Sequence, residues 1–130
     1  MNAAHARDVD LLNAFLDEIA SSESALWKLS KWSDENARPF FNCKAVSCFQ
    51  EKGYNVYRVR PLKGSLRKYR ILYAYDAPRD EFHLLAVGIK PPDPMPSPPE
   101  PWSFYNYEID HPTSKCILRE YDDRGFTKLP

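Results

Sequence analysis

Three runs of strand-forming residues, 54–60, 69–75 and 82–90, constrain the fold more than any other feature of the chain. They are rich in β-branched and aromatic residues, and turn-forming residues separate them. Because the connections are short, we expect consecutive runs to pair as an antiparallel meander. The run 82–90 is almost continuously apolar, which predicts a central or well-covered strand.

The first of these runs has the period of two that is typical of a strand with unlike faces. Tyr57 and Val59 point to one side, and Arg58 and Arg60 point to the other. On the next run, Arg70 should project to the side of the two arginines. Three guanidiniums within reach of each other repel, so we expect the free protein to fold without needing Arg70.

Helical spacing precedes the sheet. Asp8 is the predicted N-cap of a first helix, and the apolar residues that follow recur with helical spacing over 9–20. A second, weaker helical stripe continues as far as Arg38, where Pro39 stops it. The two elements predict a helical hairpin. Residues 42–52 fit either a short helix or a strand.

The C-terminal part begins with a segment that cannot be regular. Residues 91–101 contain seven prolines, which predicts an extended, proline-rich loop. After it, Asp110 or His111 can cap a helix that opens with Pro112 and ends near Gly125.

These elements predict the α+β class. We expect an N-terminal helical hairpin packed on a small antiparallel β-sheet, followed by a short C-terminal helix. The sheet is a three-strand meander, to which a fourth strand can be added. The length of 130 residues predicts a single domain over 1–130. No run approaches the ~18 apolar residues of a membrane span, so we expect a cytoplasmic protein that does not act at a membrane.

The side chains that usually hold metals or act as nucleophiles are scattered. Cys43, Cys48 and Cys116 are odd in number and lack metal-ligand pairing, which predicts buried, reduced thiols. The three histidines, at positions 5, 83 and 111, have no partner at ligand or triad spacing. We therefore expect no metal, no cofactor and no small-molecule ligand.

Positive charge is concentrated in one segment, although the formal net charge is zero. The stretch 52–75 contains no Asp or Glu, and its cations are Lys52, Arg58, Arg60, Lys63, Arg67, Lys68 and Arg70. Such a cluster can attract a phosphate backbone or an acidic protein. The alternative is a solvated strand face.

The basic runs, in order, resemble the RelE/ParE superfamily of bacterial toxins. The resemblance covers about the middle third of the chain and rests on 56–60 (VYRVR), 62–73 (LKGSLRKYRILY) and 84–90 (LLAVGIK). It implies a toxin of a toxin–antitoxin pair. The RelE branch cleaves messenger RNA in the ribosomal decoding site, whereas ParE relatives poison DNA gyrase.

The resemblance also implies the site residues. The catalytic positions of the family fall on Arg58, Arg60, Arg70, Lys90, and either Tyr105 or Tyr107, because the proline-rich insertion obscures the count. Lysine stands at 90 where RelE-type enzymes prefer arginine, so a bidentate grip on phosphate becomes a point-charge contact. The neighbouring cations Lys63, Arg67 and Lys68 are expected to bind RNA.

The leading hypothesis is a metal-independent, ribosome-dependent messenger RNA endoribonuclease that inhibits translation. Its expected partners are the ribosome, messenger RNA and a cognate antitoxin protein. One rival is a non-enzymatic, ParE-like inhibitor of DNA gyrase. A second rival is a non-toxic interaction module whose ligand is the proline-rich segment.

Overall fold

The computed structural model describes residues 3–29, 33–34, 41–62, 64–90 and 105–129. The elements in chain order are α1 (Ala3–Ala20), α2 (Glu23–Leu29), β1 (Ser33–Asp34), β2 (Phe41–Ala45), α3 (Ser47–Gln50), β3 (Val56–Pro61), the 3₁₀ turn η1 (Gly64–Lys68), β4 (Tyr69–Asp76), the 3₁₀ turn η2 (Ala77–Arg79), β5 (Glu81–Ile89) and α4 (Pro112–Asp123). The proline-rich segment 91–101 and Lys63 lie outside the described residues.

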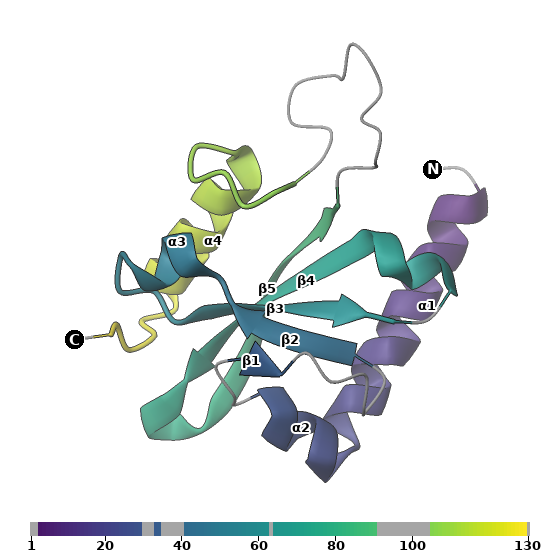
Figure 1. Cartoon of the computed structure of the whole chain (residues 1–130), viewed down its shortest axis with the longest axis horizontal. Helices are drawn as coiled ribbons and strands as arrows, with labels where there is room; N and C mark the ends of the chain where they lie inside the picture. The colour runs from purple at the N-terminus through teal and green to yellow at the C-terminus, as the bar shows by residue number, and fades with distance from the viewer. Residues whose placement is uncertain (1–2, 30–32, 35–40, 63, 91–104, 130) are drawn as a thin grey trace.

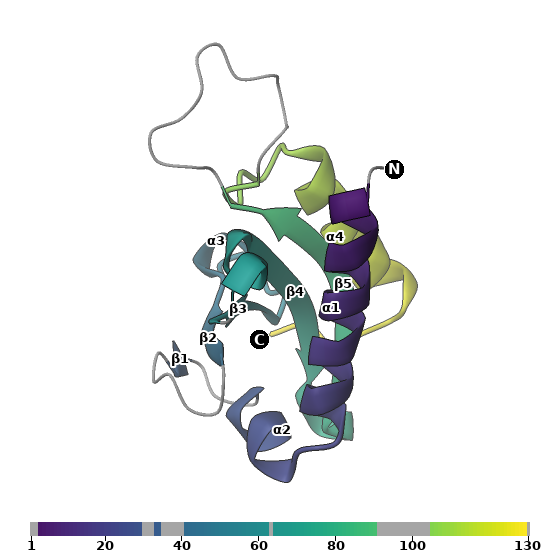
Figure 2. The same cartoon turned by 90° about the vertical axis from the view of Figure 1, so that its right-hand side faces the viewer.

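The strands form one sheet in the order β1-β2-β3-β4-β5, and every neighbouring pair is antiparallel. This confirms the predicted meander of β3, β4 and β5 and adds β2 and the two-residue β1 beside it. Helices flank the sheet, with α1 on one side and α3 and α4 on the other (Figures 1 and 2). The α+β prediction is confirmed.

The helical hairpin covers one face of the sheet. Its core joins α1 to alternate positions of β3 and β4, with Leu16 partly buried beside them: Phe15, Ile19, Tyr57, Val59, Ile71 and Tyr73. The hydroxyl of Tyr73 donates a 2.7 Å hydrogen bond to the carbonyl of Leu29 at the end of α2. This hydrogen bond connects the helical hairpin to β4.

A second core lies on the opposite face, under α4. Its buried members are Val46, Phe49, Val56, Leu72, Ala74, Tyr105, Ile117, Tyr121 and Phe126. His111 caps α4, because its Nδ1 accepts a 2.9 Å hydrogen bond from the backbone N–H of Thr113, and Pro112 opens the helix. Past the last turn, Gly125 has φ +70°, which suits glycine. The predicted helix, cap and end are all confirmed.

The N-terminal boundaries differ from the prediction. Asp8 lies inside α1 instead of capping it, and its carboxylate accepts a 2.7 Å hydrogen bond from the hydroxyl of Tyr69. The second helix ends at Leu29, well before Arg38. The ambiguous stretch 42–52 contains both β2 and α3.

Strand β5 is the edge of the sheet, so the prediction of a central or well-covered strand is wrong. Leu84 and Val87 on it are 45% and 42% exposed. A continuous apolar run shows that both strand faces meet apolar groups but says nothing about the two sides that carry backbone hydrogen bonds. Because helices pack near both faces of β5, its sequence has the continuous apolar pattern that is typical of a central strand.

Some side-chain burial also differs. Cys43 is buried as expected, but Cys48 is half-buried and Cys116 is exposed, and all three thiols are free. Trp27 of α2 is 66% exposed. Among the described helices, none is both long and apolar enough to cross a membrane.

Candidate functional site

Two adjacent strands bring three arginines to one face of the sheet. In the pairing of β3 with β4, Arg58 lies opposite Leu72 and Val59 lies opposite Ile71. Alternation therefore directs Arg58, Arg60 and Arg70 away from the helical hairpin. The burial of Arg70 lowers its pKa, and Arg60 and Arg58 lower it further by repulsion. We call these three residues the arginine cluster.

Arg70 is built into the fold. The residue is 6% exposed, and its Nη1 donates 2.8 Å hydrogen bonds to the carbonyls of both Arg67 and Tyr69. The expectation that the free protein does not need Arg70 overlooked these bonds, because alternation gives the direction of a side chain but not its partners. Removing the guanidinium would leave two carbonyls without this donor.

The other two arginines are held differently. Arg58 is half-buried, and its Nη1 donates a 2.7 Å hydrogen bond to Oδ1 of Asn42 on β2. Arg60 is exposed. Asn42 is a site residue that sequence reasoning missed, because it carries no charge. Only the β2 to β3 register, which places Asn42 opposite Arg60, could have revealed it.

Tyr107 is the tyrosine that the fold brings to the arginine cluster. Its hydroxyl is buried and makes no hydrogen bond of good geometry in the described ranges, but the Arg70 side chain lies close enough to act on the phenol as a hydrogen-bond donor. Burial raises the pKa of Tyr107, whereas Arg58, Arg70 and Arg60 each act to lower it. The backbone of Tyr107 adopts φ +64°, a left-handed conformation that is strained for a side chain of this size.

Tyr105 has a different environment. It is 2% exposed, and its hydroxyl shares a 2.7 Å hydrogen bond with Oγ of Ser114 on α4. Its ring lies over Gly88 of β5, where an added Cβ would be 2.8 Å from the Cβ of Tyr105. Burial raises the pKa of Tyr105. The absence of a side chain at Gly88 thus lets Tyr105 anchor the segment that carries Tyr107.

A cavity of about 410 Å³ opens beside Tyr107 and Arg58, and its lining residues are Lys44, Ala45, Val46, Ser47, Cys48, Arg58 and Tyr107. The thiol of Cys48 donates to the backbone carbonyl of Tyr107 at 3.3 Å. Burial raises the pKa of Cys48. The cavity therefore presents neutral and cationic groups but no carboxylate.

The remaining predicted cations do not join the cluster by any contact that the structure describes. Lys90 is exposed just after β5, and its backbone N–H donates to the carbonyl of Lys68 at 2.8 Å. The ammonium of Lys68 pairs with Asp8 of α1 at 3.1 Å, on the side of the hairpin. Arg67 is exposed, and its Nε donates to the carbonyl of Leu62 at 3.1 Å.

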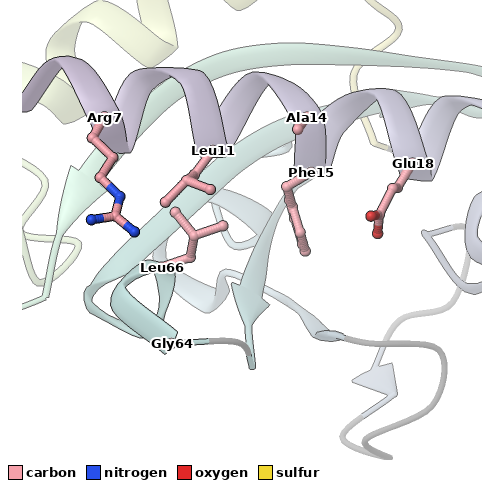
Figure 3. A pocket seen from close by; sticks show the side chains of 7 residues that line it. All are labelled: Arg7, Leu11, Ala14, Phe15, Glu18, Gly64 and Leu66. Carbon is pink, nitrogen blue, oxygen red and sulfur yellow. The ribbon is translucent and has the colours of Figure 1, made fainter.

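Another cavity, of about 360 Å³, lies between α1 and η1. Figure 3 shows Leu11, Phe15 and Leu66 between Arg7 at one end and Glu18 at the other. Its lining is mainly aliphatic, and it brings together no pair of groups suited to acid–base or nucleophilic chemistry.

The arginine cluster is suited to an anion. Within the described ranges, no carboxylate forms an ion pair with Arg60, Arg70 or Lys44. In the same ranges, no three His, Cys, Asp or Glu side chains are placed to hold a metal ion. The site can bind a phosphate group, stabilise negative charge that develops on it and offer a phenolic proton.

Comparisons with known protein families, with curated proteins and with solved structures found no match for this chain.

Proposed function

We propose that the protein is the toxin of a toxin–antitoxin pair and acts as an endoribonuclease on messenger RNA held by the ribosome. One observation carries the proposal: three arginines from two adjacent strands face the buried hydroxyl of Tyr107. The like charges gathered around this strained aromatic residue repel one another, and they suit a phosphate that occupies the site during function. The likeness of the basic runs to RelE-type toxins supports the same reading.

The arginines match the charge that develops when RNA is cut by its own 2′-hydroxyl. In that reaction the bond from O2′ to phosphorus forms, the bond from phosphorus to O5′ breaks, and negative charge increases on the phosphate oxygens. Donors that are fixed in advance stabilise this charge without reorganising. Asn42 holds Arg58, and two backbone carbonyls hold Arg70. The proposed mechanism needs no metal ion.

Tyr107 is the proposed proton donor. Because burial raises its pKa, the phenol is protonated at neutral pH. It can give its proton to O5′ as that oxygen leaves, and the arginine cluster then stabilises the phenolate. The proton of the attacking 2′-hydroxyl passes to water. The products are a 2′,3′-cyclic phosphate and a free 5′-hydroxyl.

The ribosome supplies what the free protein lacks. A chain with zero formal net charge has no strong long-range attraction for free RNA, so we propose that the ribosome positions the message. The cognate antitoxin would cover the arginine cluster with acidic and apolar residues. Both partners place the protein in the cytoplasm.

The test is to induce the parent chain and Arg60→Ala and to map message ends on translating ribosomes. Arg60 is exposed and has no described partner, so its removal should leave the fold intact. We expect cleavage to fall about 100-fold, as when one preorganised donor is lost. Lys115→Ala on the outer side of α4 is the matched control and should cleave like the parent. Intact messages with the parent protein would refute the nuclease.

A ParE-like inhibitor of DNA gyrase is the second candidate. It is favoured by an apolar groove of about 350 Å³ between α1 and β5. Val9, Leu84 and Val87 line this groove and are each more than 40% exposed, as at a protein-binding surface. Inhibition of DNA supercoiling by the purified protein, with messages left intact, would select this candidate.

A further inference from the structure

A fourth cation lies on the same face of the sheet as the arginine cluster. Lys44 of β2 pairs in register with Arg58 of β3. Directly paired residues point to the same face of a sheet, so Lys44 shares the face of Arg58. Lys44 is exposed, and within the ranges the structure describes it has no ion pair. The basic segment recognised in the sequence began at 52, so Lys44 fell outside it.

The four cations come from three consecutive strands. Arg70 lies on β4, Arg58 and Arg60 lie on β3, and Lys44 lies on β2. Neighbouring strands are about 4.8 Å apart, so positive charge extends across the sheet for about two strand spacings. A single phosphate does not need so long a row of cations, but a nucleic-acid strand laid across the sheet does.

The cavity at Lys44 has room and suitable walls for a nucleotide. Its volume is about 410 Å³, within the range of small-molecule sites. Lys44 and Arg58 provide positive charge on its lining, and Ser47 provides a hydroxyl. Val46 and Tyr107 supply the apolar and aromatic surface on which a base can rest. No acidic residue lines it.

We propose that this cavity binds the nucleotide next to the scissile phosphate and that Lys44 holds the phosphate of that nucleotide. The inference rests on the proposed ribonuclease function and adds the direction in which RNA crosses the sheet, from β4 over β3 to β2. Lys44 is a substrate-binding residue in this assignment. It contacts the RNA backbone and reads no base.

The experiment measures binding of a 2′-O-methyl hexanucleotide, which cannot be cut because its 2′-oxygens are blocked. A lysine that neutralises one phosphate of a single strand contributes about 0.7 to the slope of log affinity against log salt concentration. We expect Lys44→Ala to lower that slope by about 0.7 and to weaken binding equally for hexanucleotides of different sequence. Lys44→Arg should restore the slope. Lys115→Ala is the matched surface control and should keep the parental slope.

The outcomes separate this inference from the proposed function. An unchanged slope in Lys44→Ala, or no binding of the hexanucleotide by the parent protein, overturns the inference. A reduced slope that Lys44→Arg restores supports Lys44 as a phosphate-binding residue for RNA, and this part of the inference stands even if the parent fails to cut messages on ribosomes and the nuclease proposal falls. Urea unfolding of each variant identifies any loss that reflects the fold, and in that case Lys44→Gln is titrated instead with the same expected slope.

Discussion

The guanidinium of Arg70 serves the fold and the candidate site together. It donates to the carbonyls of Arg67 and Tyr69, so it fixes the junction of η1 with β4 while it faces Tyr107. Arg60 faces the same site from an exposed position without a described partner. Two arginines with one proposed role therefore differ in their contribution to stability.

We expect Arg70→Ala to lower the free energy of unfolding by about 1–3 kcal/mol, because the carbonyls of Arg67 and Tyr69 would lose a buried hydrogen-bond donor. Arg60→Ala should stay within about 0.5 kcal/mol of the parent, as is usual at the surface. Urea unfolding of the two variants is the measurement. Equal stability of Arg70→Ala and the parent would mean that water replaces the guanidinium fully.

The two tyrosines before α4 make a matched pair. Tyr107→Phe removes a buried hydroxyl that makes no hydrogen bond of good geometry in the described ranges, so stability should stay within about 1 kcal/mol of the parent. Cleavage should fall about 100-fold if the proposed proton donor is lost in this way. Tyr105→Phe breaks the bond to the fully buried Ser114 and should cost about 1–2 kcal/mol.

Per folded molecule, Tyr105→Phe should cleave at the parental rate. Thermal unfolding and message cleavage, measured on the same samples, give both quantities. The reverse pattern, with Tyr105→Phe inactive and Tyr107→Phe active, would move the proton donor to Tyr105.

Sequence reasoning predicted the three arginines of the candidate site. Alternation along β3 and β4 was enough to gather Arg58, Arg60 and Arg70, because each strand is regular there. It could not find Asn42 and Lys44, since their strand was ambiguous with a helix and its register depends on long-range pairing. It also could not choose between Tyr105 and Tyr107, because a loop conformation with positive φ decides that choice.

At the scale of elements, β5 supports the segment 105–107, because Gly88 has no side chain and Tyr105 can pack directly on it. Gly88 lies opposite Arg70 in the β4 to β5 register, and Tyr105 packs on it. The backbone N–H of Tyr105 also donates to the carbonyl of Ile89 at 2.8 Å. The distance between Tyr107 and the arginine cluster is therefore set by an edge strand.

We expect Gly88→Ala to disturb this support, because the new Cβ would lie 2.8 Å from Cβ and 2.9 Å from Cδ2 of Tyr105. Such overpacking costs about 1–3 kcal/mol. A displacement of about 1 Å at Tyr107 would reduce cleavage about 100-fold. Val87→Ala, at a 42% exposed neighbour, should leave both quantities near the parental values. Full cleavage by Gly88→Ala, measured on ribosomes, would show that the segment adjusts freely.

Elements with strong local signals could be predicted, and those fixed by distant contacts could not. The caps and periodicity of α4 determine its limits from within, so the helix was found nearly to the residue. The second helix was extended too far, because weak helical spacing continues past Leu29 although the chain enters β1 at Ser33. The edge position of β5 depends on the whole sheet order, which no local pattern encodes.

At the scale of the whole molecule, tyrosines pack in both cores, one on each face of the sheet. The fold raises the pKa of seven of them: Tyr57, Tyr69, Tyr73, Tyr75, Tyr105, Tyr107 and Tyr121. Burial is the main cause except at Tyr75, where the hydrogen bond to Asp80 comes first. For Tyr69, burial and the hydrogen bond to Asp8 raise the pKa to about 12.

This predicts a loss of stability at alkaline pH. Below about pH 10 both states keep their phenolic protons, and above it the unfolded chain releases protons first, so the free energy of unfolding falls as pH rises. The contribution of Tyr69 to the free energy of unfolding should be lost between about pH 10 and pH 12. Urea unfolding across this range should show a shallower decline for Tyr69→Phe than for the parent. A flat profile in the parent would contradict the burial described here.

The sheet lies between two sets of contacts. One set joins it to α1 and α2, and the other includes α4, Tyr107 and the arginine cluster. In a genetic selection for cells that survive induction of the proposed toxin, this separation should sort the survivors into two classes. Survivors that still accumulate full-length protein should carry substitutions on the arginine side of the sheet. Survivors with substitutions on the hairpin side should contain little full-length protein, because the fold is lost.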